Sequence, residues 1–217
     1  MKVLELFAGS CSFSNVSATY GFETFTIDNG LDLKTVDHYK KIDLVKDILE
    51  LNIDEIPFHP DIIWASPPCT TFSIASCGHH WNPPDESGIR IPKTDAAETG
   101  LLLLEKTIWI MNELQPKYYF IENPRGLMRK MGAVEHLKRH TVTYCQYGDN
   151  RMKPTDIWTN LDWTPRAMCK NGQPCHEAAP RGSRTGTQGL KNNYERSKIP
   201  YFLSREIIHT ILHKEND

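Results

Sequence analysis

The sequence predicts an α/β domain built on a mostly parallel, doubly wound sheet. Across roughly the first 160 residues, short runs of branched and aromatic side chains alternate with helix-like runs, which is the pattern of a parallel sheet covered on both faces. The composition, 39% hydrophobic and 24% charged in 217 residues, is typical of a globular protein with one sizeable core. Ligands bind such sheets at the carboxyl ends of the strands, so polar residues that follow strands are candidates for function.

Strands are predicted wherever branched and aromatic side chains dominate, because these pack well on a pleated surface. A weaker candidate, KKIDLV at residues 40–45, has the same character over a shorter run. The stronger candidates, in chain order, are residues 2–8, 23–29, 61–68, 117–124, 140–148 and 155–160.

Helices are predicted where apolar residues recur with helical spacing or where end signals occur. Gly21 is a typical stop for the first helix. The second begins with Asp95 and Glu98, which we interpret as a capping pair, and it ends before Pro116. The predicted helices cover residues 12–20, 95–115 and 201–214.

Residues 163–198 predict a long, irregular and basic insert. This segment holds seven basic and two acidic residues, a local charge of +5, although the whole chain carries only −2. Four glycines and few branched apolar residues argue against regular structure. Positive charge on such a backbone suits contacts with phosphate groups, and a solvated loop that binds nothing is the alternative.

The cysteines and the apolar runs bear on where the protein works. No uninterrupted apolar run approaches the roughly 18 residues of a membrane span, so we expect no membrane segment and a cytoplasmic protein. The six cysteines are then expected to be free thiols, nucleophiles or metal ligands rather than disulfides.

The first predicted strand runs directly into a turn at Gly9 and then into a helix. This arrangement presents backbone N–H groups and small side chains to a nucleoside ligand. The next strand ends in Asp28, at the position of the ribose-binding acids of dinucleotide folds. A strand, a turn and a helix that serve only as scaffold are the alternative.

Cys69 follows the third strong strand candidate after two prolines, which fix the backbone before the sulfur. Polar residues follow it, and this environment suits a nucleophile better than a buried filler. The next predicted strand ends in Glu122 and Asn123, which therefore lie at the same edge of the sheet. Thiol, carboxylate and amide together predict a catalytic set.

Five motifs follow one another in the order and approximate spacing of the AdoMet-dependent cytosine-C5 DNA methyltransferases. They are LELFAGSCSFS, TIDN, DIIWASPPCTTFS, FIENPRGL and YCQYGDNRMKPTDIWTN, and RSKIPYFLSREI resembles the last motif of the family. The chain resembles a small, phage-type member. This implies a Rossmann-like class I methyltransferase fold with an AdoMet-binding catalytic domain (1–162), a reduced target-recognition insert (163–198) and a C-terminal helix that packs back (199–217).

The resemblance implies S-adenosyl-L-methionine (AdoMet) as the cofactor. Asp28 is then expected to hold the ribose and Asp47 to lie near the adenine. Pro67 is expected to contact the cofactor or the target base. The first loop is expected to surround the methionine part of AdoMet through Phe7, Ala8, Gly9, Ser10 and Cys11.

By the same resemblance, Cys69 is the nucleophile that adds to C6 of cytosine, so that C5 becomes enamine-like and accepts the methyl group. Glu122 is expected to hydrogen-bond or protonate N3, and Asn123 to orient the site. Because a stacked base cannot be reached, it must be flipped out of the duplex.

Two departures from the family pattern matter. Pro124 stands where a valine usually follows the Glu-Asn pair. Arg151 and Lys153 stand where the family has two arginines. We expect Arg151 to contact the base or a phosphate. Lys153 is the weaker match, because lysine does not reproduce a bidentate arginine.

DNA is the expected partner, and the short insert predicts short or relaxed sequence specificity. The alternatives are an accessory protein that supplies specificity, the same chemistry on a pyrimidine in RNA or a free nucleotide, and a non-catalytic DNA-binding relative. An exocyclic-amine methyltransferase is disfavoured, since it would carry an aromatic side chain where Cys69 stands. The resemblance also suggests a restriction-modification role in a bacterial or phage-infected cell.

Two further segments carry residues of interest. Cys169, Cys175 and His176 lie together in the insert, and residues 77–80 add a cysteine and two histidines. Their spacing is not that of a standard finger, so we favour free thiols and no metal, with a structural zinc as the alternative.

The irregular loop at residues 73–94 is long enough to suit a lid over a flipped base, in which Trp81 and Arg90 would contact DNA. A rigid surface loop is the alternative.

Overall fold

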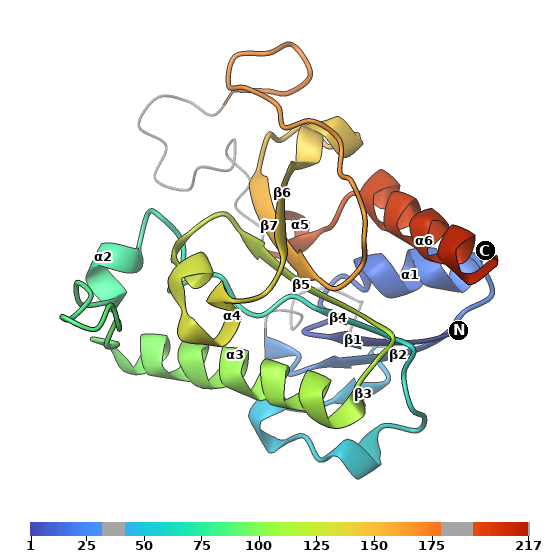
Figure 1. The fold of residues 1–217 in the computed structure, drawn as a ribbon, viewed down its shortest axis with the longest axis horizontal. Coiled ribbons are helices and arrows are strands. Elements are labelled where there is room, and N and C mark those ends of the chain that lie inside the picture. The colour runs from blue at the N-terminus through green and yellow to red at the C-terminus, as the bar shows by residue number, and fades with distance from the viewer. Residues whose placement is uncertain (32–41, 179–192, 217) are drawn as a thin grey trace.

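The computed structural model describes residues 1–31, 42–178 and 193–216, and these form one seven-stranded sheet with helices on both faces (Figure 1). Every predicted strand is present, and the weaker candidate at residues 40–45 appears as the short strand β3. The strands are β1 (Lys2–Leu6), β2 (Glu23–Asp28), β3 (Leu44–Val45), β4 (Ile62–Ala65), β5 (Tyr118–Pro124), β6 (Arg139–Thr143) and β7 (Pro154–Thr159).

The strand order is β3-β2-β1-β4-β5-β7-β6, which confirms a mostly parallel, doubly wound sheet. The strands from β3 to β5 are parallel, and β7 lies antiparallel between β5 and β6. The chain winds outward from β1 to β3 and then crosses to β4, so the order reverses between β1 and β4. Ligands bind outside the strand ends at such a switch point.

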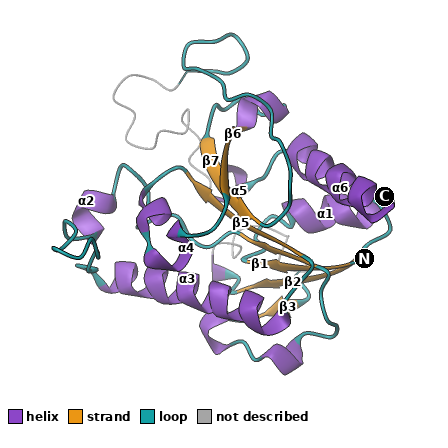
Figure 2. Ribbon diagram, viewed as in Figure 1, coloured by secondary structure: helices purple, strands orange, loops and turns teal. Residues whose placement is uncertain are grey.

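The helices divide between the two faces of the sheet (Figures 1 and 2). Helix α1 packs beside α6 on one face, and α3 covers the other face together with α4. The three long helices agree with the predicted ones. The helices are α1 (Ser12–Thr19), α2 (Cys77–His80), α3 (Asp95–Leu114), α4 (Gly132–Glu135), α5 (Asn193–Ser197) and α6 (Tyr201–Asn216).

Strand β4 shows why the sequence folds in this way. Its four residues are all buried, and alternate side chains point to opposite faces of the sheet. Ile62 and Trp64 join the cluster under α1 and α6, while Ile63 and Ala65 join the cluster under α3. A strand covered on both faces must be apolar throughout, and this is the run that ends just before Cys69.

Two local predictions are corrected by the structure. The N-cap of α3 is Thr94, whose hydroxyl accepts a hydrogen bond from the Ala97 amide at 3.3 Å. Asp95 and Glu98 lie instead in the first turn, where acidic groups complement the helix dipole. The strand predicted at residues 140–148 ends at Thr143 and continues as a 3-10 turn over Tyr144–Tyr147.

The insert is described at its two ends, residues 163–178 and 193–198. Arg181, Arg184 and Lys191, which contribute to its predicted positive charge, lie outside the described residues. The predicted domain boundaries therefore stay a prediction. Among the described residues, no helix has both the length and the apolar character that crossing a membrane requires.

Candidate active site

The loop after β1 is a tight left-handed turn. Phe7, Gly9 and Cys11 have φ angles of 55°, 42° and 49°, so the backbone reverses within a few residues. Cys11 is the N-cap of α1 and is buried together with Ala8. The predicted cofactor-binding residues Phe7 to Cys11 all lie in this turn, at the switch point of the sheet.

Asp28 fixes this loop from the end of β2. One carboxylate oxygen accepts a hydrogen bond from the Gly9 amide at 3.0 Å, and the other accepts from the Gly30 amide at 2.7 Å. The structure thus brings together Asp28 and Gly9, two of the predicted cofactor-binding residues, and leaves the side chain of Asp28 partly exposed. A carboxylate in this place can accept hydrogen bonds from the hydroxyls of a ribose.

Glu5 is a buried carboxylate that the sequence analysis did not select. It lies on β1 and accepts hydrogen bonds from the Phe13 and Ser14 amides, at 3.4 and 2.7 Å, at the start of α1. Burial raises the pKa of Glu5 to about 7, against the opposing effect of the hydrogen bonds from Ser14 and Phe13, with the charge of Asp28 adding a small increase. The sequence signal that could have identified Glu5 is the presence of an acidic residue inside an otherwise apolar strand.

Asp47 follows β3 and caps a short 3-10 turn, where its carboxylate accepts a hydrogen bond from the Leu49 amide at 2.9 Å. It lies at the carboxyl edge of the sheet, on the side of β2. The predicted contact with adenine stays a prediction.

The loop that carries Cys69 is held from the neighbouring strand. Asn123 on β5 is fully buried, and its side-chain amide donates a hydrogen bond to the Pro67 carbonyl at 2.9 Å. On the other side, the Cys69 carbonyl accepts hydrogen bonds from the Phe72 and Ser73 amides at 3.1 and 3.0 Å. Asn123 therefore holds the loop that carries Cys69, and its predicted orienting role stays a prediction.

Glu122 lies beside Asn123 at the end of β5 and is buried. The Tyr144 hydroxyl donates a hydrogen bond to its Oε1 at 2.7 Å, and the Lys153 Nζ lies 3.9 Å from the same atom. The Lys153 ammonium also lies over the Tyr144 ring, 4.6 Å from its centroid. The sequence pattern predicts a strand over Tyr144 and gives no signal that its hydroxyl reaches Glu122.

Cys69, Glu122 and Lys153 interact electrostatically. Burial raises the pKa of the Cys69 thiol, Lys153 and Arg196 oppose that rise, and the negative charge of Glu122 adds to it. Burial also lowers the pKa of Lys153, while Glu122 and Cys69 act in the opposite direction. A thiol, a carboxylate and an ammonium group thus share one site at the carboxyl edge of β4 and β5.

Arg151 has the contacts of a positioning residue. It is 4% exposed and forms an ion pair with Asp149, with Nε 2.8 Å from Oδ1. Its Nη1 donates to the carbonyls of Glu195 and Arg196 at 3.2 and 3.3 Å, and Lys153 donates to the Arg196 carbonyl at 3.0 Å. The two basic residues therefore fasten α5, at the end of the insert, to the active site.

The loop at residues 73–94 is anchored from inside. Trp81 is 2% exposed, stacks on Phe72 with ring centroids 5.4 Å apart, and donates its indole N–H to the Thr71 carbonyl at 3.0 Å. In this structure Trp81 is thus a buried anchor rather than a DNA-contacting side chain. Arg90 is partly exposed and donates to the Asn82 carbonyl at 3.1 Å.

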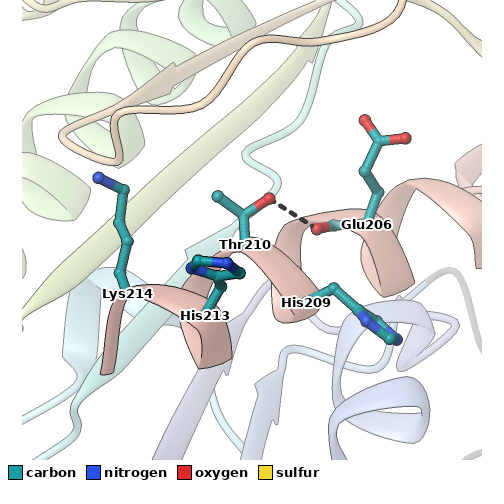
Figure 3. A pocket seen from close by; sticks show the side chains of 5 residues that line it. All are labelled: Glu206, His209, Thr210, His213 and Lys214. Carbon is teal, nitrogen blue, oxygen red and sulfur yellow. Dashed lines mark hydrogen bonds between the residues drawn. The ribbon is translucent and has the colours of Figure 1, made fainter. Parts of the chain in front are cut away.

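A surface pocket on α6 is separate from the site that holds Cys69 and Glu122 (Figure 3). It is lined by residues of that helix alone. The Thr210 hydroxyl donates to the Glu206 carbonyl at 3.0 Å, and the His209 ring is hydrogen-bonded to the Tyr20 hydroxyl at 2.8 Å. None of the predicted catalytic residues lines it, so the site at the ends of β4 and β5 remains the candidate active site.

The sheet order and the loop at its switch point fit the fold of class I methyltransferases, the class that uses AdoMet. The model of the C-5 cytosine-specific DNA methylase family matches residues 1–142. This chain belongs to that family.

A similar curated protein, from frog virus 3 (isolate Goorha), is described as a probable DNA (cytosine-5)-methyltransferase. It is 30% identical over 185 residues, which cover 81% of this chain and 78% of the viral protein.

Two solved structures share the fold at low sequence identity. One is described as a putative DNA modification methyltransferase encoded within a prophage (E. coli), with a TM-score of 0.52, 17% identity, and coverage of 79% of this chain and 52% of that one. The other is the methyltransferase EhMeth of Entamoeba histolytica, with a TM-score of 0.54, 16% identity, and coverage of 76% and 53%. This chain spans about half the length of both structures.

Proposed function

We propose that this chain transfers a methyl group from AdoMet to C5 of cytosine in DNA through a covalent adduct with Cys69. The observation that carries the proposal is the single site shared by Cys69, Glu122 and Lys153, at the edge of the sheet where ligands bind. Family membership supports the same activity.

The residues around the β1 loop fit AdoMet. Its ribose hydroxyls suit the partly exposed carboxylate of Asp28, and Gly9 and Ser10 leave little side chain to block its methionine part. Pro67 is buried just after β4, and its carbonyl accepts a hydrogen bond from the side-chain amide of Asn123. AdoMet, when bound, supplies the methyl group as a sulfonium electrophile.

Cys69 starts the reaction. Lys153 and Arg196 stabilise its thiolate, which attacks C6 and forms the C6–S bond. Glu122 hydrogen-bonds N3 and delivers a proton to it during the attack, which limits the charge that develops on the ring. Tyr144 and Lys153 hold the Glu122 carboxyl group in place for this step.

C5 then takes the methyl group, forming a C5–CH3 bond as the S–CH3 bond of the donor breaks. Water removes the C5 proton, the C5–C6 double bond re-forms, and the C6–S bond breaks to return Cys69 as a thiolate. Glu122 recovers its proton from N3. The product is 5-methylcytosine.

The insert at residues 163–198 is the proposed target-recognition segment. Its described ends carry Arg166, Lys170, Arg196 and Lys198, which suit the DNA backbone. Because the segment is short, we expect short or relaxed specificity, or an accessory protein that supplies it. The proposal includes the predicted division of the chain into a catalytic domain (1–162), a recognition insert (163–198) and a C-terminal helix (199–217).

The test is transfer of labelled methyl from AdoMet by wild type and Cys69→Ala onto duplex DNA, single-stranded DNA, RNA and dCMP, followed by nucleoside mass spectrometry. We expect 5-methylcytosine in DNA from wild type and none from the variant. Label on RNA or dCMP alone would contradict DNA as the substrate. Transfer that survives loss of Cys69 would contradict the mechanism.

A further inference from the structure

Four potential metal ligands meet where the insert touches the catalytic domain. Cys145 lies in the 3-10 turn after β6, and Cys169, Cys175 and His176 come from the insert. Their ligand atoms all lie within 4.8 Å of one another. Cys145 was not among the sequence candidates, because it is 24 residues before Cys169 and has no spacing relation to the other three.

The distances suit a tetrahedral metal site. The Nδ1 of His176 lies 3.6 Å from the Sγ of both Cys169 and Cys175, and the two sulfurs are 3.2 Å apart. Zinc bonds of about 2.3 Å to sulfur and about 2.0 Å to nitrogen separate the ligand atoms of a tetrahedron by about 3.5 to 3.8 Å. A disulfide would bring the sulfurs to about 2.05 Å, well below the separation here.

The donor chemistry favours zinc. Three thiols and one imidazole form a Cys3His set, which is a common structural zinc site, and soft sulfur ligands disfavour magnesium and calcium. Cys145 and Cys169 are buried, so a cation at the centre would compensate the charge of their thiolates. The Gln146 side-chain amide points to the Cys175 sulfur at 3.7 Å, as outer-shell donors to zinc-bound thiolates do.

The cluster lies in a segment of the insert that has few buried residues of its own. Most of residues 164–178 is exposed, and the segment is fastened to the sheet by polar contacts, such as the Cys169 amide to the Thr143 hydroxyl at 2.9 Å. A metal can replace a core in a segment of this kind. Cys145 directly follows Tyr144, whose hydroxyl contacts Glu122, so a metal here would also tie the insert to the active-site wall.

We propose that Cys145, Cys169, Cys175 and His176 bind one Zn²⁺ that fastens the recognition insert to the turn carrying Tyr144. The proposal concerns the insert and does not depend on the methyl-transfer reaction, since the metal lies outside the set of groups assigned to the chemistry. Zinc content and methyl transfer are therefore measured separately.

The test measures zinc by mass spectrometry in the full chain, purified with reductant and dialysed against a weak chelator. We expect about one zinc per chain in wild type. Cys175→Ser changes an exposed ligand, so the chain is expected to fold, and retained zinc should fall at least about tenfold because one thiolate is lost. Cys77→Ser, a free cysteine outside the cluster, is the matched control and should retain zinc.

Cobalt substitution gives a second readout. Wild type loaded with Co²⁺ should show the intense visible bands of a tetrahedral ion and a thiolate charge-transfer band, and Cys175→Ser should lose part of the latter. Chelation should also expose the insert to a protease while AdoMet binding remains.

Three results would overturn the proposal. The first is wild type that holds no zinc after reconstitution, and the second is equal zinc in the Cys175→Ser and Cys77→Ser variants. The third is a Cys169–Cys175 disulfide, seen by peptide mass, in protein kept reduced.

Discussion

The two halves of the candidate active site are built by different means. The cofactor half, around β1 and β2, is shaped mainly by backbone: a left-handed loop, a parallel register, and two amides on Asp28. The target half, around β5 to β7, is shaped by side chains, with Tyr144 on Glu122 and Arg151 on the backbone of α5. Substitutions of Glu122 or Tyr144 in the target half should therefore change chemistry first. Substitutions of the buried supporting residues of the target half, or of residues in the cofactor half, should change stability first.

Glu122→Gln should give the largest effect on chemistry. The amide keeps the shape but cannot deliver a proton to N3, so kcat should fall by about 10²- to 10⁴-fold. AdoMet affinity should stay near that of wild type, because the cofactor half is untouched. Single-turnover methyl transfer together with AdoMet titration tests this, and an equal loss of cofactor binding would contradict the division into halves.

Asp156→Ala tests how far the target half depends on polar side chains. Asp156 on β7 is fully buried and accepts hydrogen bonds from the Arg129 Nε at 2.9 Å and the Thr141 hydroxyl at 2.7 Å. Removing this carboxylate takes away the hydrogen bonds that it accepts from Arg129 and Thr141, so the free energy of unfolding should fall by about 3 kcal/mol. Denaturant unfolding measures it, with Asp162→Ala on the exposed Lys138–Asp162 pair as the control.

The structure also separates what a sequence pattern can reveal from what it cannot. Strand β4 was predictable, because a strand that is buried on both faces is apolar throughout, and the polar residues after it indicated a candidate site. Tyr144 and Trp81 were not predictable. Whether an aromatic residue next to a turn or in a proline-rich loop faces inward depends on partners distant in sequence, such as Glu122 for Tyr144. Cys145 could not be grouped with Cys169, Cys175 and His176 from the sequence for the same reason, because these partners are distant from it in the chain.

Glu5→Gln tests the cofactor half by pH. The pKa of Glu5 is raised from 4.5 to about 7 in the folded chain, so the folded state binds more protons than the unfolded state between these values. The contribution of Glu5 to the free energy of unfolding of wild type is fully present below pH 4.5 and is lost as the pH rises through about 7. On going from pH 4.5 to 8, the variant should therefore gain up to about 3 kcal/mol relative to wild type.

Urea unfolding across this pH range measures the difference between Glu5→Gln and wild type. Glu23→Gln, at the exposed start of β2, is the control and should show little change with pH. A Glu5→Gln difference that stays constant with pH would show that the carboxyl group is ionised throughout.

Tyr144→Phe should give the smallest of these effects. It removes the hydroxyl that donates to Glu122 at 2.7 Å and leaves the ring in place. A lost hydrogen bond to a carboxylate corresponds to roughly tenfold in kcat. KM for DNA should be unchanged, which distinguishes positioning of Glu122 from a general loss of structure. Tyr118→Phe, at the other end of β5, should leave kcat unaltered.

The central claim is that Cys69 attacks the target base, and trapping the adduct tests it most directly. DNA that carries 5-fluorocytosine can accept the methyl group at C5. The fluorine on C5 cannot then leave as the proton of ordinary cytosine does, so the C6–S bond should persist and the enzyme should stay attached. We expect an AdoMet-dependent covalent complex whose crosslinked peptide contains Cys69, formed equally by Cys77→Ser and not by Cys69→Ala. Methyl transfer to ordinary cytosine without any such complex, or a crosslink at another residue, would contradict the account.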